Sequence, residues 1–131
     1  MRTNPATFQI NNTQQLLFVL RGANMAITTD QPFTKVFNGT LYDPVYIVVN
    51  CKSGAFNTAC AGGVFTAASK GGSAIVAVGQ SYATLTGVNA QVHPAIKANL
   101  TSFSATPILS LTTGNTGALT ADWFFYGDCV D

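Results

Sequence analysis

The sequence predicts an all-β domain of about eight strands, arranged as a sandwich or a barrel. Clusters of Gly, Pro, Asn and Thr divide the chain into short segments rich in Val, Ile, Phe, Tyr and Thr, which favour a pleated strand over a helix. No stretch shows the sustained apolar period of about 3.6 residues that an amphipathic helix requires. With 131 residues, the chain fits one domain with a core of its own.

Eight segments carry the strand pattern, and a polar N-terminal arm, residues 1–14, precedes a single β domain at 15–131. The segments are Gln15 to Arg21, Phe33 to Phe37, Val45 to Cys51, Gly63 to Ala67, Ala74 to Val78, Gln91 to Ala98, Ile108 to Thr112 and Trp123 to Tyr126. The stretch SYATLTG, residues 81–87, is compatible with one helical turn or with a loop.

Asn38 and Gly39 indicate a tight turn, because both residue types tolerate the positive φ angles of a type I′ hairpin. We therefore expect the segment Phe33 to Phe37 to pair with the segment that enters at Thr40, although Pro44 interrupts the second arm.

Charged side chains make up only 8% of the sequence, against about 25% in typical soluble domains. There is no glutamate and the net charge is +1, so the chain offers no electrostatic field for nucleic acid or anionic lipid. The longest apolar runs, such as Leu16 to Leu20 and Val45 to Val49, are too short to cross a bilayer. We therefore expect neither a nucleic-acid partner nor a membrane.

The shortage of charge also bears on assembly. Charged side chains normally keep soluble monomers apart and protect the edges of sheets, and six basic and five acidic residues are too few for that. Neutral Thr, Ser, Asn and Gln supply the polarity instead, and another protein can cover them without desolvating ions. We expect an obligate homo-oligomer, and a three-fold ring is compatible with this.

The stretch AGGVFTAASKGGSAIVAVG, residues 61–79, raises the question of a phosphate-binding loop. That loop requires Gly, four residues and then Gly-Lys-Ser or Gly-Lys-Thr, and it leads into a helix. Here the order is Ser-Lys-Gly-Gly-Ser, and the following AIVAV is short and partly β-branched. We interpret the glycines as relieving backbone strain in a connection between strands.

Catalytic motifs are not apparent. His93 is the single histidine, so a Ser-His-Asp or Cys-His catalyst would have to use it. Pro94 follows it directly, and neither a Gly-x-Ser-x-Gly motif nor a catalytic cysteine signature accompanies it. A glycosidase pair would have to come from five scattered aspartates. We expect a surface histidine and no enzymatic activity.

The cysteines do not form a zinc motif, because Cys51 and Cys60 are nine positions apart and no second pair exists. A disulfide between these two across the loop KSGAFNTA is an alternative that needs an oxidising compartment or late oxidation after release. The N-terminus MRTNPATFQINNTQQ lacks the apolar segment of a secretory signal. We therefore expect synthesis in the cytoplasm and reduced thiols, including that of Cys129.

Three aspartates, Asp122, Asp128 and Asp131, lie near the C-terminus, but they do not follow the Asp-x-Asp-x-Asp-Gly pattern of a calcium loop. Solvated aspartates explain them equally well. No metal ion or cofactor is predicted.

The block WFFY at Trp123 to Tyr126 is the main candidate for an interaction surface. Alternation along a strand places half of these rings in the core and half outside, where they pack under a second layer or meet a neighbouring subunit. The arm could also drape over a partner or be loose. The predicted interface residues are Arg2, Phe8, Trp123 and Tyr126.

Three segments, RGANMAITTDQPF, AGGVFTAASKGGSAIVAVGQSYATLTG and LSLTTGNTGALTADWFFYGD, resemble segments of the small capsid decoration or cement proteins of tailed bacteriophages. The resemblance is one of size and style over most of the chain. It implies a single-domain antiparallel sandwich with jelly-roll-like topology, a homotrimer made in the host cytoplasm and placed on the outside of the virion. Its partner would be the major capsid protein, and the family has no catalytic residue to carry over.

Two other functions are compatible with the sequence. One is a carbohydrate- or receptor-binding module of a phage fibre or tail, in which Tyr82, Trp123 and Tyr126 would stack on sugars. The other is a small hydrolase built on His93.

Overall fold

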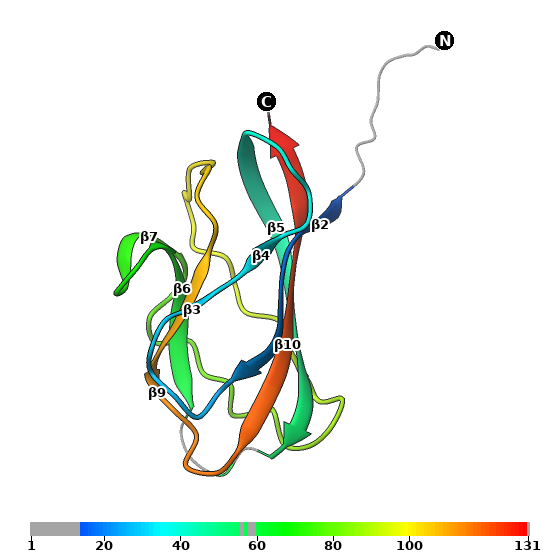
Figure 1. The fold of residues 1–131 in the computed structure, drawn as a ribbon, viewed down its shortest axis with the longest axis vertical. Coiled ribbons are helices and arrows are strands. Elements are labelled where there is room, and N and C mark those ends of the chain that lie inside the picture. Colours follow the sequence, from blue (N-terminus) through cyan, green and yellow to red (C-terminus); the bar gives the residue numbers. More distant parts are fainter. Residues whose placement is uncertain (1–13, 56, 58–59, 131) are drawn as a thin grey trace.

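The computed structural model describes residues 14–55, 57 and 60–130. In this part of the chain, nine strands form two antiparallel sheets that pack against each other (Figure 1). The larger sheet has the order β4 (Thr34–Lys35), β2 (Gln15–Asn24), β10 (Leu119–Val130), β5 (Leu41–Gly54) and β8 (Gln91–Val92). The smaller sheet has the order β3 (Gln31–Pro32), β9 (Ile108–Thr113), β6 (Ala61–Ala67) and β7 (Gly71–Val76). The predicted all-β sandwich is confirmed.

All eight predicted segments contain strand residues, but two of the strands are much shorter than expected. The segment 33–37 contributes only β4, and the segment 91–98 contributes only β8. After β8 the chain leaves the larger sheet, and the backbone N–H of Lys97 donates to the carbonyl of Ile75 on the edge of β7. Pro94 lacks the N–H that a continuing strand would need. Residues 81–87 form a loop, in which Ser81 bridges to Ala61 and a turn at residues 83–84 is closed by the N–H of Leu85 donating to the carbonyl of Tyr82. Within the described residues, no helix is long and apolar enough to cross a membrane.

The prediction of a hairpin at Asn38 and Gly39 is wrong. Strand β4 pairs with β2, while β5 lies on the far side of β10, so the connection crosses the end of the sheet. Neither turn residue has a positive φ. The buried Tyr42 holds this connection, because its hydroxyl accepts from the N–H of Gly39 at 2.8 Å and donates to the carbonyl of Phe37 at 2.8 Å.

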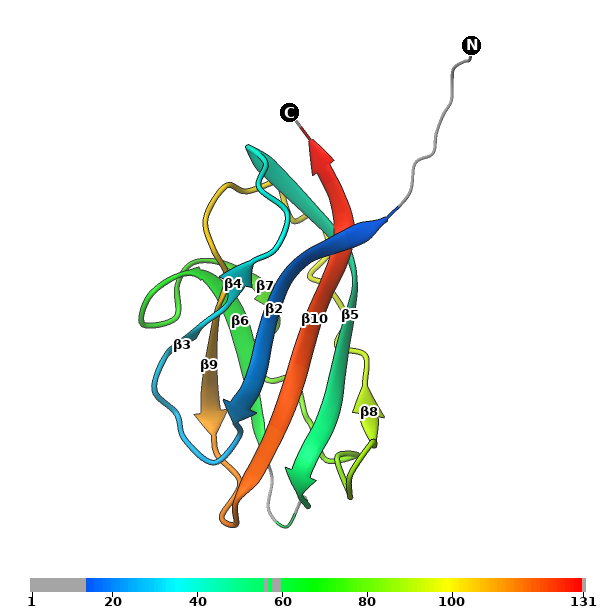
Figure 2. The same ribbon diagram turned by 45° about the vertical axis from the view of Figure 1, so that its right-hand side comes forward.

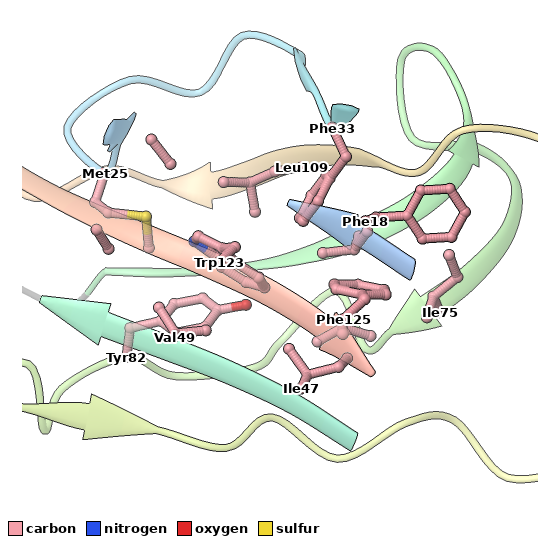
Figure 3. Close-up of a cluster of buried hydrophobic side chains, with 14 of the residues drawn as sticks. Phe18, Met25, Phe33, Ile47, Val49, Ile75, Tyr82, Leu109, Trp123 and Phe125 are labelled. Atoms are coloured by element: carbon pink, nitrogen blue, oxygen red, sulfur yellow. The ribbon is translucent and has the colours of Figure 1, made fainter. Parts of the chain in front are cut away.

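Strand β10 organises the larger sheet. It pairs with β2 on one side and with β5 along its whole length on the other (Figure 2). Its side chains alternate, and those of Trp123 and Phe125 are completely buried between the sheets (Figure 3). The ring of Phe33 packs edge-on against both, with centroids 5.9 and 4.9 Å away. Such tilted contacts between aromatic rings add to the gain from burying their area.

Replacing Phe125 with alanine should lower the free energy of unfolding by about 3 to 5 kcal/mol, because it leaves a cavity among buried rings. The matched control is Tyr126→Ala on the opposite face of the same strand, which removes a cross-strand contact and should cost about 1 kcal/mol or less. Urea titrations followed by tryptophan fluorescence measure both. Equal losses would show that the two faces of β10 are not packed differently.

Candidate functional site

The outward side of the larger sheet carries aromatic and aliphatic side chains, where a one-sided antiparallel sheet usually presents polar ones. Because Trp123 and Phe125 point into the core, Phe124 and Tyr126 point away from it. Directly paired residues lie on the same face, which brings in side chains from β2 and β5. We call this surface the aromatic face; its members are Leu16, Val19, Tyr46, Val48, His93, Phe124 and Tyr126.

The rings of the aromatic face already cover one another. Tyr46 and His93 stack with centroids 5.3 Å apart and ring planes at 20°, and Tyr126 lies 6.1 Å from Tyr46 on its other side. The guanidinium of Arg21 lies over the ring of Phe124 at 5.4 Å from its centroid. Tyr46 still exposes 46% of its surface. The row therefore presents mainly ring edges and hydroxyls to a partner.

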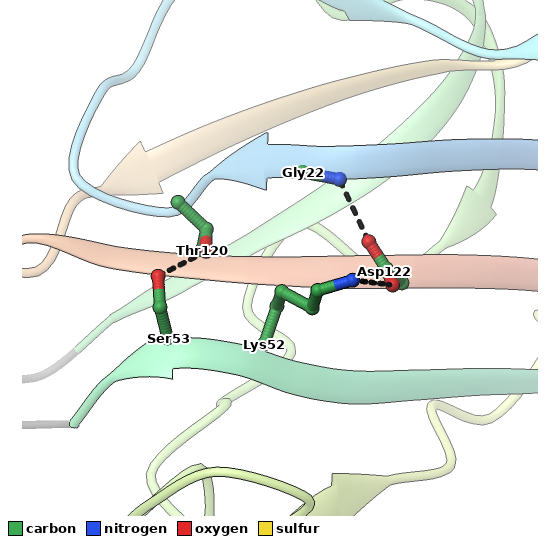
Figure 4. Close-up of polar contacts among 5 residues, drawn as sticks. All are labelled: Gly22, Lys52, Ser53, Thr120 and Asp122. Atoms are coloured by element: carbon green, nitrogen blue, oxygen red, sulfur yellow. Dashed lines mark hydrogen bonds and ion pairs between the residues drawn. The ribbon is translucent and has the colours of Figure 1, made fainter.

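One end of the aromatic face is a polar cluster centred on Asp122 (Figure 4). Its carboxylate is 6% exposed and accepts from the backbone N–H of Gly22 at 2.8 Å, and the ammonium of Lys52 lies 3.7 Å away. A hydrogen bond of 2.6 Å joins the hydroxyls of Ser53 and Thr120 beside it. Asp122 therefore ties β10 to both of its neighbours. Arg21, Lys52 and Asp122 together carry a net charge of +1, and we call this end of the aromatic face the basic end.

The opposite end carries two carboxylates. Asp43 on β5 pairs directly with Asp128 on β10, next to the pair formed by the inward-facing Tyr42 and Cys129. Alternation therefore turns both aspartates outward, and we call this the acidic end. Asp122 and Asp128 are six residues apart on one strand, which separates them by about 20 Å. They cannot converge on one calcium ion, and Asp131 lies outside the described residues.

The predicted interface residues divide between core and surface. The prediction that Trp123 is an interface residue is wrong, because Trp123 is 0% exposed. Its buried Nε1 has no hydrogen-bond partner. Tyr126 lies on the aromatic face. Arg2 and Phe8 fall outside the described residues. No sequence pattern groups Tyr46, His93 and Arg21 as members of one surface, since only strand pairing brings them together.

The prediction that Tyr82 stacks on sugars is also wrong, because its side chain is completely buried. Its hydroxyl donates to the carbonyl of Gly62 at 2.7 Å, and its ring packs against Trp123. His93 is exposed, as expected of a surface histidine, and its Nδ1 lies 3.3 Å from the carbonyl oxygen of Ile47.

The cysteines are free thiols, so the alternative of a disulfide between Cys51 and Cys60 is not realised. Both are buried, and burial raises the pKa of each thiol. The thiol of Cys60 donates to the carbonyl of Met25. Among the described residues, no three His, Cys or Asp side chains lie close enough together to hold a metal ion.

A second polar site lies on the smaller sheet, where a shallow pocket of about 400 Å³ is lined by Thr28, Thr29, Asp30, Ser69, Lys70 and Ser110. The connection between β6 and β7 is residues 68–70, and the two glycines of SKGG begin β7 rather than forming the connection. Ser69 and Lys70 take the left-handed conformation there, with φ of 57° and 59°. Lys70 Nζ donates to the buried hydroxyl of Ser110 at 3.0 Å.

The backbone N–H of Ser69 donates to Asp30, and this hydrogen bond is the main cause of that carboxyl's lowered pKa. Asp30 therefore stays ionised at neutral pH. These contacts fasten the hairpin tip over the sheet. The hydroxyl of Ser110 is only 1% exposed, so it is not placed to attack a substrate.

Comparison with protein-family models, with curated proteins and with solved structures finds no significant match to this chain.

Protein stability should be constant from neutral pH to about pH 9 and fall above it. Burial raises the pKa of Tyr82, with a further contribution from Cys60, and burial raises the pKa of both buried thiols above 9.0. The unfolded chain would release these protons at lower pH than the folded chain, so rising pH favours unfolding.

Urea titrations at several pH values check this. Tyr82→Phe should make the decline above pH 10 shallower, because it removes the buried hydroxyl whose pKa is raised. The explanation fails if the variant loses stability above pH 10 as steeply as the wild type.

Proposed function

We propose that the protein is a non-enzymatic structural protein of a viral shell, a capsid decoration or cement protein of a tailed bacteriophage. It would be made in the host cytoplasm and bind the major capsid protein on the outside of the head. The observation that carries the proposal is the aromatic face, a sheet surface with an uncharged centre. Exposed apolar surface of this kind marks a contact with another protein.

The strand order supports a jelly-roll topology for this sandwich. Strands β2, β10, β5 and β8 lie opposite β3, β9, β6 and β7, and successive strands mostly alternate between the two sheets. The first and last of these strands, β2 and β10, lie side by side. This order is consistent with the double Greek-key arrangement found in capsid and lectin domains, and such a fold by itself does not choose between the two.

Ring geometry favours a protein partner over a sugar. Stacking on a sugar uses the open face of an aromatic ring. In the aromatic face, Tyr46 and His93 occupy one face of each other, and Arg21 covers a face of Phe124. Two of the three rings predicted for a carbohydrate site, Tyr82 and Trp123, are buried. Of the three residues predicted to stack on sugars, only Tyr126 therefore remains a candidate.

Binding to phage heads should depend on the aromatic face. The double variant Tyr46→Ser, Tyr126→Ser should bind heads that lack this protein at least about 30-fold more weakly, because buried tyrosines at such contacts contribute about 2 kcal/mol. Cosedimentation with heads of the encoding phage measures the affinity. Heads carrying the wild-type chain should also resist heat better than bare heads.

The matched control is Val78→Ser, Val88→Ser, which removes apolar side chains that are 50% and 63% exposed away from the aromatic face. This control should bind heads like the wild type. Wild-type protein that neither binds heads nor changes their resistance to heat would overturn the proposal.

A further inference from the structure

We infer that the aromatic face binds a second copy of this chain, in a two-fold pair that places the basic end of each copy on the acidic end of the other. The inference goes beyond the proposed function and uses the same surface, so the two contacts exclude each other and the pair must dissociate before the chain binds a head. It differs from the three-fold ring expected from the sequence, because a two-fold contact uses the same surface on both copies.

The distribution of charge argues for this partner. The basic end holds Arg21 and Lys52 with Asp122, for a sum of +1, and the acidic end holds Asp43 and Asp128, for a sum of −2. About 20 Å of uncharged surface length along β10 separates the two ends. A partner that complements this face must therefore be apolar in the middle and carry opposite charges at its two ends in the reverse order.

A second copy meets these requirements when the two-fold axis lies between the faces and runs across the strands. The axis reverses the strand direction, so Arg21 of one copy faces the Asp43 and Asp128 pair of the other. The same contact occurs twice. The apolar row packs on itself between the two contacts, in the manner of two sheets stacked about 10 Å apart.

The acidic end supplies a second reason. Like charges directly opposite on neighbouring strands destabilise a sheet, and Asp43 and Asp128 are such a pair. No described lysine or arginine forms an ion pair with either of them, since the ion pair within the described residues joins Lys52 to Asp122. A guanidinium from a second copy would relieve their repulsion.

The size of the face indicates a reversible pair. Four strands and a length of six residues give about 20 Å by 20 Å, or about 400 Å² per copy, which is about half of a standard interface. We therefore expect a dissociation constant in the micromolar range at moderate salt, and weaker association at high salt.

Charge reversal with rescue tests the pair in the full chain by sedimentation equilibrium. Arg21→Glu alone leaves −1 against −2, and Asp43→Lys with Asp128→Lys leaves +1 against +2, so each should weaken dimerisation by about tenfold because both contacts become repulsive. All three changes together give −1 against +2, the wild-type charges with their signs exchanged, and should restore the wild-type affinity. Lys97→Glu, at an exposed site away from the aromatic face, is the control and should dimerise like the wild type.

A monomer mass at every concentration would overturn the inference, as would a trimer mass or a reversal of both ends that does not restore dimerisation. Amide circular dichroism of each variant separates loss of pairing from loss of folding, and Tyr46→Ser, Tyr126→Ser provides a second route to the monomer. A monomeric wild type that still binds heads through the aromatic face would refute the pair and leave the proposed function standing. A wild type that dimerises as expected but binds no heads would do the reverse.

Discussion

The structure depends on the pairing of β10 between β2 and β5. This one strand supplies Trp123 and Phe125 to the core and Phe124 and Tyr126 to the aromatic face. Because the side-chain period of a strand is two, a slip of one residue would exchange the two sets and expose the indole. Burial of the inner rings therefore fixes the position of the outer ones. A partner that binds the aromatic face meets side chains held in register by the core of the domain.

The few charges of the chain matter through their positions. On the outward side of β2, β10 and β5 they stand at the two ends of the aromatic face, where they leave its centre uncharged and give it a direction. Asp122 also has a structural role, because it accepts from the backbone of β2 and attracts Lys52 on β5. Exposed ion pairs contribute little to stability, but complementary charges fix orientation between partners.

The two outer surfaces of the sandwich differ in how they are covered. On the smaller sheet, the chain covers its own surface with the hairpin tip, which Lys70 and Ser69 fasten to Ser110 and Asp30. This closure holds two non-glycine residues in the left-handed conformation, which costs about 1 to 2 kcal/mol for each. On the larger sheet, no comparable loop covers the aromatic face among the described residues.

The sequence by itself determined that the chain is all-β and which eight segments contain strands, because β-branched and aromatic runs between glycines and prolines have no helical alternative. It did not determine where the strands begin, since β5 and β10 each start four residues before the predicted segment. It also determined that the rings of Trp123 to Tyr126 divide between two faces, but period two does not say which half faces inward, and Trp123 was assigned to the wrong one. The hairpin at Asn38 failed because β4 prefers β2, a partner distant in sequence. Tertiary pairing alone decided the aromatic face, since Arg21, Tyr46, His93 and Phe124 come from four separate segments with no shared local pattern.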